Sequence, residues 1–176
     1  MYINKKWSNL ILQKEIIIEG RPQFMVIQFD CEKVSICNLY ASNFAAERAQ
    51  FWRHLRRVLT ATNISHWCLA GDFNMLEDPA DRTGGRGRTI YGQELLEWEK
   101  LLFSLGITDV WGSPQFATSS DSLTFSRSNG TQVNTKLSRI DRYYVSEFFR
   151  EKGGHIEIIA GTVSSDHRPL FVGLKS

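Results

Sequence analysis

Apolar residues in this chain fall into short runs separated by polar segments. Residues 24–29 and 34–40 are apolar and β-prone, and the polar residues 30–33 between them suit a hairpin loop. Residues 67–70 form a continuous apolar run, which is typical of a strand that is covered on both faces. The pattern therefore predicts a hairpin followed by a buried strand.

Two segments have the spacing of an amphipathic helix. The first begins after Ser42 or Asn43, either of which suits the N-cap position. Its arginines, including Arg48, lie largely off the apolar face, where they form a solvated surface or, alternatively, a surface for phosphate. The second covers residues 93–105 and ends at Gly106. The expected inward residues of the two helices are Phe51, Trp52, Leu55, Val58 and Leu59, then Leu95, Leu96, Leu102 and Leu105.

The second half of the sequence is richer in strands. Its predicted strands cover residues 122–126, 140–145, 156–159 and 170–174, with a short helical turn at 146–152. Strands alternate with helices early and cluster late, which predicts an α/β fold, a layered sandwich of mixed β-sheets with helices outside. There is no repeat and no low-complexity tract, so we expect residues 1–176 to form one domain.

Composition narrows the class of protein only slightly. The 176 residues are 42% hydrophobic and 23% charged, as in ordinary globular proteins, and the net charge of +2 does not identify a polyanionic partner. No apolar run is long enough to cross a bilayer, and the start of the chain does not resemble a secretory signal. The three cysteines suggest reduced thiols. We therefore expect an intracellular protein, either nuclear or cytoplasmic, with no membrane association and no obligate protein partner.

Asp72 and Asn74 follow the buried run and suggest a ligand-binding site. Strand ends are where α/β sheets place such groups, and residues i and i+2 of a strand point the same way. A carboxylate can accept a proton from water, and an amide can donate to a phosphate oxygen. By itself the segment Gly-Asp-Phe-Asn suits a turn equally well, because Asp and Asn favour turns.

Three further polar residues lie at the boundaries of apolar runs. Asp141 lies within an apolar strand, and Asp166 and His167 come directly before the last one. A histidine beside acids is suited to proton transfer near neutral pH. Because such runs end at the rim of a core, we expect these residues to converge with Asp72 and Asn74 on one cleft.

Four segments, in this order, resemble the signatures of a known family. They read CNLYASN, LAGDFN, SRIDRYYVS and SSDHRPL. Together they are similar to the endonuclease/exonuclease/phosphatase superfamily, which includes abasic-site endonucleases and the deoxyribonuclease I type. Two segments, EDPADRTGG and SRIDR, look most like the endonuclease domains of plant-type non-LTR retrotransposons. The resemblance implies a metal-dependent phosphodiesterase, with DNA, or possibly RNA, as its partner.

The resemblance also implies a role for each matching residue. Asp72 would orient or deprotonate the attacking water, and Asn74 would bind the scissile phosphate and help to place Asp72. His167 would stabilise charge on a phosphate oxygen, or act as the base, and Asp141 would set its tautomer. Asp166 would lie near the divalent metal. The hard oxygen ligands favour Mg²⁺, with Mn²⁺ as a possible substitute.

Substrate contacts are expected around these groups. By resemblance, Tyr40 would contact phosphate and Asn43 the nucleic-acid backbone. The glycine-rich segment DRTGGRGR holds Arg82, Arg86 and Arg88, which suit a backbone phosphate. A surface loop with solvated charges explains this segment equally well.

The sequence departs from the family pattern at its start. Relatives begin with a strand that carries an asparagine and a later strand that ends in the main metal-binding glutamate. This sequence has neither segment, and Glu15 and Glu19 stand in a different context. The resemblance therefore implies an N-terminally truncated copy that lacks the first strands and helix. Two alternatives to an endonuclease follow: a catalytically inactive remnant with at most weak nucleic-acid binding, and a phosphatase of phosphate esters.

Overall fold

The computed structural model describes residues 4–18, 21–29, 31–83, 88–118, 122–127, 136–159 and 165–175. Its helical elements are η1 (Lys5–Leu10), α1 (Ala45–Thr60), η2 (Pro79–Asp81), α2 (Gly92–Leu105) and α3 (Glu147–Lys152). Its strands are β1 (Ile11–Ile16), β2 (Gln23–Phe29), β3 (Glu32–Tyr40), β4 (His66–Asp72), β5 (Ile107–Asp109), β6 (Phe116–Thr118), β7 (Phe125–Arg127), β8 (Lys136–Ser138), β9 (Asp141–Ser146), β10 (Gly154–Ile158) and β11 (Leu170–Leu174).

The largest sheet has six strands in the order β1-β2-β3-β4-β9-β5. Strands β3 and β4 are parallel, and the other neighbours are antiparallel, so the sheet is mixed. The expected hairpin is confirmed as β2 and β3, which pair from Gln23↔Asn38 to Phe29↔Glu32. The expected buried strand is β4, which lies between β3 and β9.

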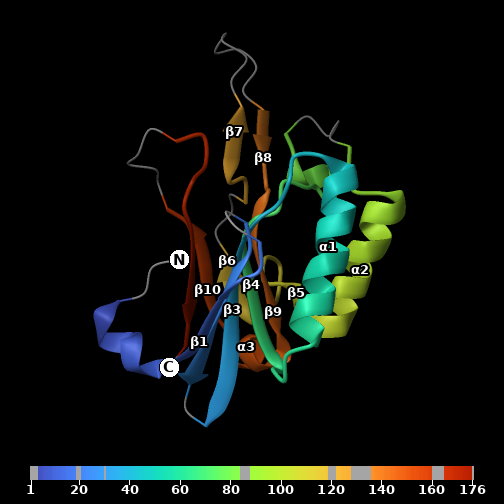
Figure 1. The fold of residues 1–176 in the computed structure, drawn as a ribbon. Coiled ribbons are helices and arrows are strands. Elements are labelled where there is room, and N and C mark those ends of the chain that lie inside the picture. Colours follow the sequence, from blue (N-terminus) through green and yellow to red (C-terminus); the bar gives the residue numbers. More distant parts are fainter. Residues whose placement is uncertain are drawn as a thin grey trace.

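A second, three-stranded sheet has the order β11-β10-β6. It is also mixed, because β10 is antiparallel to β11 and parallel to β6. Strands β7 and β8 form a separate antiparallel pair at one end of the sandwich (Figure 1). In the same view, α1 and α2 cover one side of the six-stranded sheet, and β10 lies on the other (Figure 1).

Side-chain alternation along the strands divides the interior into two cores. On β4, Trp67 and Leu69 point toward α1 and α2, where they join one buried cluster. Cys68, between them, packs against the other cluster, which fills the space between the two sheets and includes Val145 and Ile156. The predicted sandwich of packed mixed sheets with helices outside is therefore confirmed.

Three expectations about the helices were wrong. The N-cap of α1 is Phe44, because the Ser42 hydroxyl instead accepts from the Phe44 amide at 3.1 Å. Leu96 is 44% exposed, because α2 turns Trp98 and Leu101 inward instead. Arg48 is not on a solvated surface: it is buried and paired with Glu94, Nε to Oε1 at 2.5 Å.

Most of the remaining boundaries follow the sequence pattern. Gly106 ends α2 in the left-handed conformation, with φ of 59°, as expected for a glycine C-cap. Strand β1 was not predicted, since only part of its sequence is apolar and five of its six residues are exposed. Within the described residues, no helix combines the length and the apolar character that crossing a membrane requires.

Candidate active site

Three polar side chains stand in register at one end of the six-stranded sheet. Tyr40, the last residue of β3, pairs with Asp72, the last residue of β4. Asp72 in turn pairs with Asp141, the first residue of β9. Each occupies the same alternation phase as residues that face the second sheet, such as Cys68 and Val145. The pairing of the strands thus explains why residues about 70 positions apart in the sequence lie side by side.

Asn74 braces the Asp72 carboxylate. Its backbone amide donates to Asp72 Oδ1 at 2.8 Å, and its side-chain Nδ2 donates to Asp72 Oδ2 at 3.1 Å. The same Nδ2 donates to the Ala41 carbonyl at 2.9 Å. Asn74 has φ of 49°, a left-handed conformation that asparagine tolerates better than most residues. The side-chain amide therefore uses one hydrogen on Asp72 and the other on Ala41, and donation to a phosphate requires one of these bonds to be exchanged.

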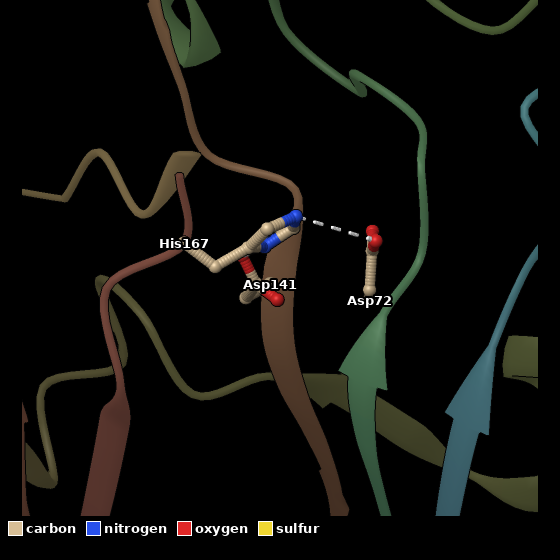
Figure 2. Close-up of side chains that lie close together, drawn as sticks. All are labelled: Asp72, Asp141 and His167. Atoms are coloured by element: carbon tan, nitrogen blue, oxygen red, sulfur yellow. Dashed lines mark hydrogen bonds and ion pairs between the residues drawn. The ribbon is translucent and has the colours of Figure 1, made fainter. Parts of the chain in front are cut away.

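His167 reaches the two carboxylates from the segment before β11. Its backbone forms an isolated antiparallel β-bridge with Phe125, and the centroids of the two rings lie 4.9 Å apart. His167 Nδ1 is 2.9 Å from Asp141 Oδ2, and its Nε2 is 3.9 Å from Asp72 Oδ2. Figure 2 shows the ring with Asp141 and Asp72 on either side of it. Asp141 thus holds Nδ1 as the protonated nitrogen, and Nε2 faces the Asp72 side.

This environment changes the acidity of both partners. Burial raises the pKa of Asp72 to about 6, and the nearby charges of Asp141 and Asp166 add to the effect, while the hydrogen bond from Asn74 and the charge of His167 oppose it. For His167, burial lowers the pKa, but the hydrogen bond and the charge of Asp141 outweigh it and raise the pKa above its usual value. At neutral pH, Asp72 is therefore an ionised but comparatively basic carboxylate.

A buried ion network holds the loop that follows Asp72. Asp81 receives Arg139 Nε at 2.9 Å and also pairs with Arg142, whose side chain is fully buried. Arg142 Nη1 contacts Glu77 at 3.1 Å and Asp109 at 3.0 Å. This network fixes the loop against β8, where Arg82 Nε donates to Ser138 Oγ at 2.9 Å.

These groups border one cleft of about 960 Å³. The cleft brings together most of the residues expected from the sequence: Tyr40, Asn43, Asp72, Asn74, Arg82, Arg88, Asp166 and His167. Asp141 lies behind His167, in an adjoining cavity between the sheets. Arg86 lies outside the described residues. The sequence did not single out Lys136 or Ser138, which also line the cleft, because isolated polar residues of β8 carry no motif.

The acidic groups of the cleft offer ligands for a divalent metal. One ligand atom from each of Asp72, Asp141 and His167 can be chosen so that all three lie within 4.8 Å of one another. However, Asp141 and His167 are already hydrogen-bonded to each other. Asp166, which is exposed, lies close enough for its charge to raise the pKa of Asp72. Asp166 therefore offers an exposed carboxylate near Asp72 to a hard cation such as Mg²⁺, which keeps several water ligands of its own.

Comparison with known proteins gives matches in structure only. No family model matches the sequence, and no curated protein matches it. A solved abasic-site (AP) endonuclease from Archaeoglobus fulgidus superposes with a TM-score of 0.71 at 15% identity, over 94% of this chain and 72% of that one. The endonuclease domain of TRAS1, a telomere-specific non-LTR retrotransposon, gives a TM-score of 0.65 at 15% identity, over 91% of this chain and 66% of that one. A 3′-5′ exonuclease from Neisseria meningitidis gives 0.60 at 19%, over 89% and 65%.

These matches establish the class of fold. The chain has the α/β sandwich of the endonuclease/exonuclease/phosphatase proteins, so the fold implied by the sequence resemblance is confirmed. The chain spans about two thirds of the length of the TRAS1 domain and of the Neisseria exonuclease. The description of the retrotransposon domain agrees with the finer resemblance of the loop after Asp72.

Proposed function

We propose that this chain is a metal-dependent phosphodiesterase that cuts a DNA strand by attack of an activated water molecule. The observation that supports this most strongly is the placement of Asp72, Asp141 and His167. They come from three separate segments and meet where Asp72 and His167 line a cleft that cationic side chains also line. Hydrolysis of a phosphodiester requires a positioned water, charge neutralisation on the phosphoryl oxygens and a proton for the leaving group.

Asp72 is the group that accepts the proton of the attacking water. Its raised pKa of about 6 makes it a stronger base than an ordinary carboxylate, yet it remains largely ionised at neutral pH. Asn74 keeps both carboxylate oxygens in a fixed orientation through its two donors. The basic group is therefore held in place before substrate binds.

His167 is the group that meets charge on the phosphate. Asp141 holds Nδ1, so a protonated ring has Nε2–H free to donate toward the cleft. Its raised pKa keeps the imidazolium populated near neutral pH. In this scheme Asp141 acts through His167, as the residue that sets its orientation and charge.

Cationic and hydroxyl groups around the centre suit a nucleic-acid backbone. Tyr40 and Asn43 line the cleft at and just after the end of β3, and Arg82, Arg88 and Lys136 line it as well. Arg86 belongs to the same glycine-rich segment and is proposed with them. Phosphate contacts of this kind do not read sequence, so they suit DNA and RNA alike.

Asp166 is the carboxylate that would hold the metal, which we propose to be Mg²⁺, with Mn²⁺ as a substitute. When bound, the ion supplies Lewis-acid polarisation of a phosphoryl oxygen. The donor set on this chain is small, so we expect weak binding that depends on the water and phosphate ligands that Mg²⁺ also takes.

A plasmid nicking assay tests the proposal. Supercoiled plasmid, intact or depurinated, is incubated with the protein in Mg²⁺ or in EDTA, beside Asp72→Ala and the matched surface variant Glu157→Gln. Nicking that requires Mg²⁺, disappears in Asp72→Ala and persists in Glu157→Gln supports the proposal. Absence of nicking by the folded protein contradicts it and favours an inactive remnant, whereas release of phosphate from a monoester alone favours a phosphatase.

A further inference from the structure

Two bulky aromatic residues occupy positions where helices normally begin with a small polar residue. Phe44 is the N-cap of α1 and Tyr91 is the N-cap of α2, and neither side chain caps its helix. Serine, threonine, aspartate and asparagine are preferred there because they bond the free amides of the first turn. Phe44 is 69% exposed and Tyr91 is 51% exposed, so core packing does not explain the choice. A residue that departs from a local sequence preference, with no compensating interaction in the fold, tends to occupy a functional position.

The two aromatic residues belong to one rigid part of the surface. Arg48, in the first turn of α1, pairs with Glu94, in the first turn of α2, through Nε–Oε1 at 2.5 Å and Nη2–Oε2 at 3.2 Å. The Arg48 amide also donates to the Phe44 carbonyl at 3.0 Å. This buried pair ties together the two helix starts that carry Phe44 and Tyr91. The exposed rings are therefore presented from a fixed base.

This surface borders the proposed catalytic cleft. Asn43 and Arg48 line the cleft on either side of Phe44 in the sequence, and Arg88 and Ile90 line it just before Tyr91. The Arg88 guanidinium lies over the Tyr91 ring, 4.0 Å from its centroid. A guanidinium held over a ring still has N–H groups available for a phosphate, and aromatic faces accept stacked bases of any sequence.

We propose that Phe44, Tyr91 and Arg88, here called the aromatic rim, bind unpaired nucleotides next to the phosphate that is cut. Bases within a continuous duplex are stacked on each other and are not free to stack on protein side chains. The preferred substrate is then a strand with unpaired bases beside the cleavage site. This proposal rests on the proposed function, which identifies the ligand as a nucleic acid. It adds that the enzyme selects a strand with unpaired bases.

Binding without cleavage tests the aromatic rim separately from catalysis. Fluorescence anisotropy is measured in EDTA with a short labelled single-stranded oligonucleotide and with the duplex of the same sequence. The variants are Phe44→Ala, Tyr91→Ala and Arg88→Ala. The matched control is Phe103→Ala, which removes an aromatic ring that is 90% exposed near the other end of α2. Circular dichroism and thermal melting confirm that each variant is folded.

The expected result is a loss of single-strand affinity of about five- to a hundredfold for Phe44→Ala and Tyr91→Ala, as for the loss of one stacked base. Duplex affinity should change less than about twofold, and Phe103→Ala should match the wild type. The salt dependence should be unchanged in Phe44→Ala and weaker in Arg88→Ala, because only the latter loses a phosphate contact.

Two results with the variants overturn the aromatic rim: equal losses of affinity for single strand and duplex, or no loss of affinity in either aromatic variant. Failure of the wild type to bind the single strand overturns it as well. If the protein binds the single strand through these residues but cuts nothing, the proposed function fails and the rim stands. If the protein nicks plasmid while Phe44→Ala and Tyr91→Ala bind like the wild type, the proposed function stands and the aromatic rim is overturned.

Discussion

His167 is held between two carboxylates that belong to one pair of strands: its Nδ1 lies 2.9 Å from Asp141 and its Nε2 lies 3.9 Å from Asp72. Because Asp72 and Asp141 are directly paired across β4 and β9, the distance between them is set by the sheet and not by a loop. The shorter contact fixes the tautomer of the ring, and the longer one leaves Nε2 facing the cleft. A rigid sheet thus supplies the geometry that proton transfer requires.

The first prediction concerns the charge of Asp141. Replacing it in Asp141→Asn keeps the shape but removes the negative charge that raises the pKa of His167, so that pKa should fall. The pKa is measured by NMR titration of the His167 ring in EDTA, with Glu157→Gln as the control that leaves it unchanged. The rate of cleavage at neutral pH should fall by roughly a hundredfold or more, as for loss of a group that stabilises charge in the transition state. An unchanged His167 pKa would show that Asp141 does not set its charge.

The second prediction separates the side-chain amide of Asn74 from its left-handed backbone conformation. Asn74→Gly keeps the left-handed backbone allowed but removes the side-chain amide, whereas Asn74→Ala removes the amide and also strains a backbone with φ of 49°. Both variants should cut slowly, because Asp72 loses its bond from Nδ2. Asn74→Ala should be less stable than Asn74→Gly by about 1–2 kcal/mol in urea unfolding. Equal cleavage by Asn74→Gly and the wild type would remove Asn74 from the account.

The third prediction is a dependence of stability on pH through Asp81. Burial opposes ionisation of Asp81, but the charges of Arg142 and Arg139 hold its pKa below the usual value. A lowered folded-state pKa means that its ionisation stabilises the fold above the unfolded pKa of about 4, and that this contribution is lost as the pH falls through the folded value. The free energy of unfolding of the wild type should therefore decline in this acid range.

In Asp81→Asn this acid decline should be shallower. The variant should also be less stable at neutral pH. The loss in free energy of unfolding should lie near the low end of the about 3–5 kcal/mol that breaking a buried ion pair costs, because Arg142 keeps its contacts with Glu77 and Asp109. Glu99→Gln, on the exposed surface of α2, is the matched control. Parallel pH profiles of the wild type and Asp81→Asn would contradict the assignment.

The fourth prediction concerns the glycine before Asp72. Gly71 has φ of 135°, and a Cβ at this position would lie 2.0 Å from the Leu39 carbonyl oxygen of the neighbouring strand. Gly71→Ala should therefore cost more than about 4 kcal/mol or prevent folding. Gly106→Ala is the control, because Gly106 also has positive φ, at 59°, but open space around its Cβ position. It should cost only about 1–2 kcal/mol. Similar losses in the two variants, measured by urea unfolding, would contradict the close approach.

The sequence predicted the parts of the site that depend on strand ends. Apolar runs end where a sheet meets solvent, so Asp72 and His167 were expected at a common rim, and the structure brings them within 3.9 Å. The direct pairing of Asp72 with Asp141 needed the strand order, because α2 and strands β5 to β8 separate β4 from β9 in the sequence. Periodicity identifies the elements but not which strands become neighbours.

Other features depended on partners that are far apart in the sequence. The burial of Arg48 follows from Glu94, 46 positions away, and no local pattern marks an arginine that will be paired. The same holds for Arg142, whose partner Asp81 is 61 positions away. No local pattern predicts the exposure of Phe44 and Tyr91 either, because it depends on which surfaces the packed helices leave open.

The most direct test of the central claim is the single-turnover rate at which the protein cuts a labelled oligonucleotide in Mg²⁺. The account predicts a rate that vanishes in EDTA, falls by roughly 10²-fold or more in both Asp72→Asn and His167→Gln, and is unchanged in Glu157→Gln. A rate that is the same in the wild type and in Asp72→Asn, or no cleavage by the folded wild type, would contradict the claim that Asp72 and His167 form a hydrolytic centre.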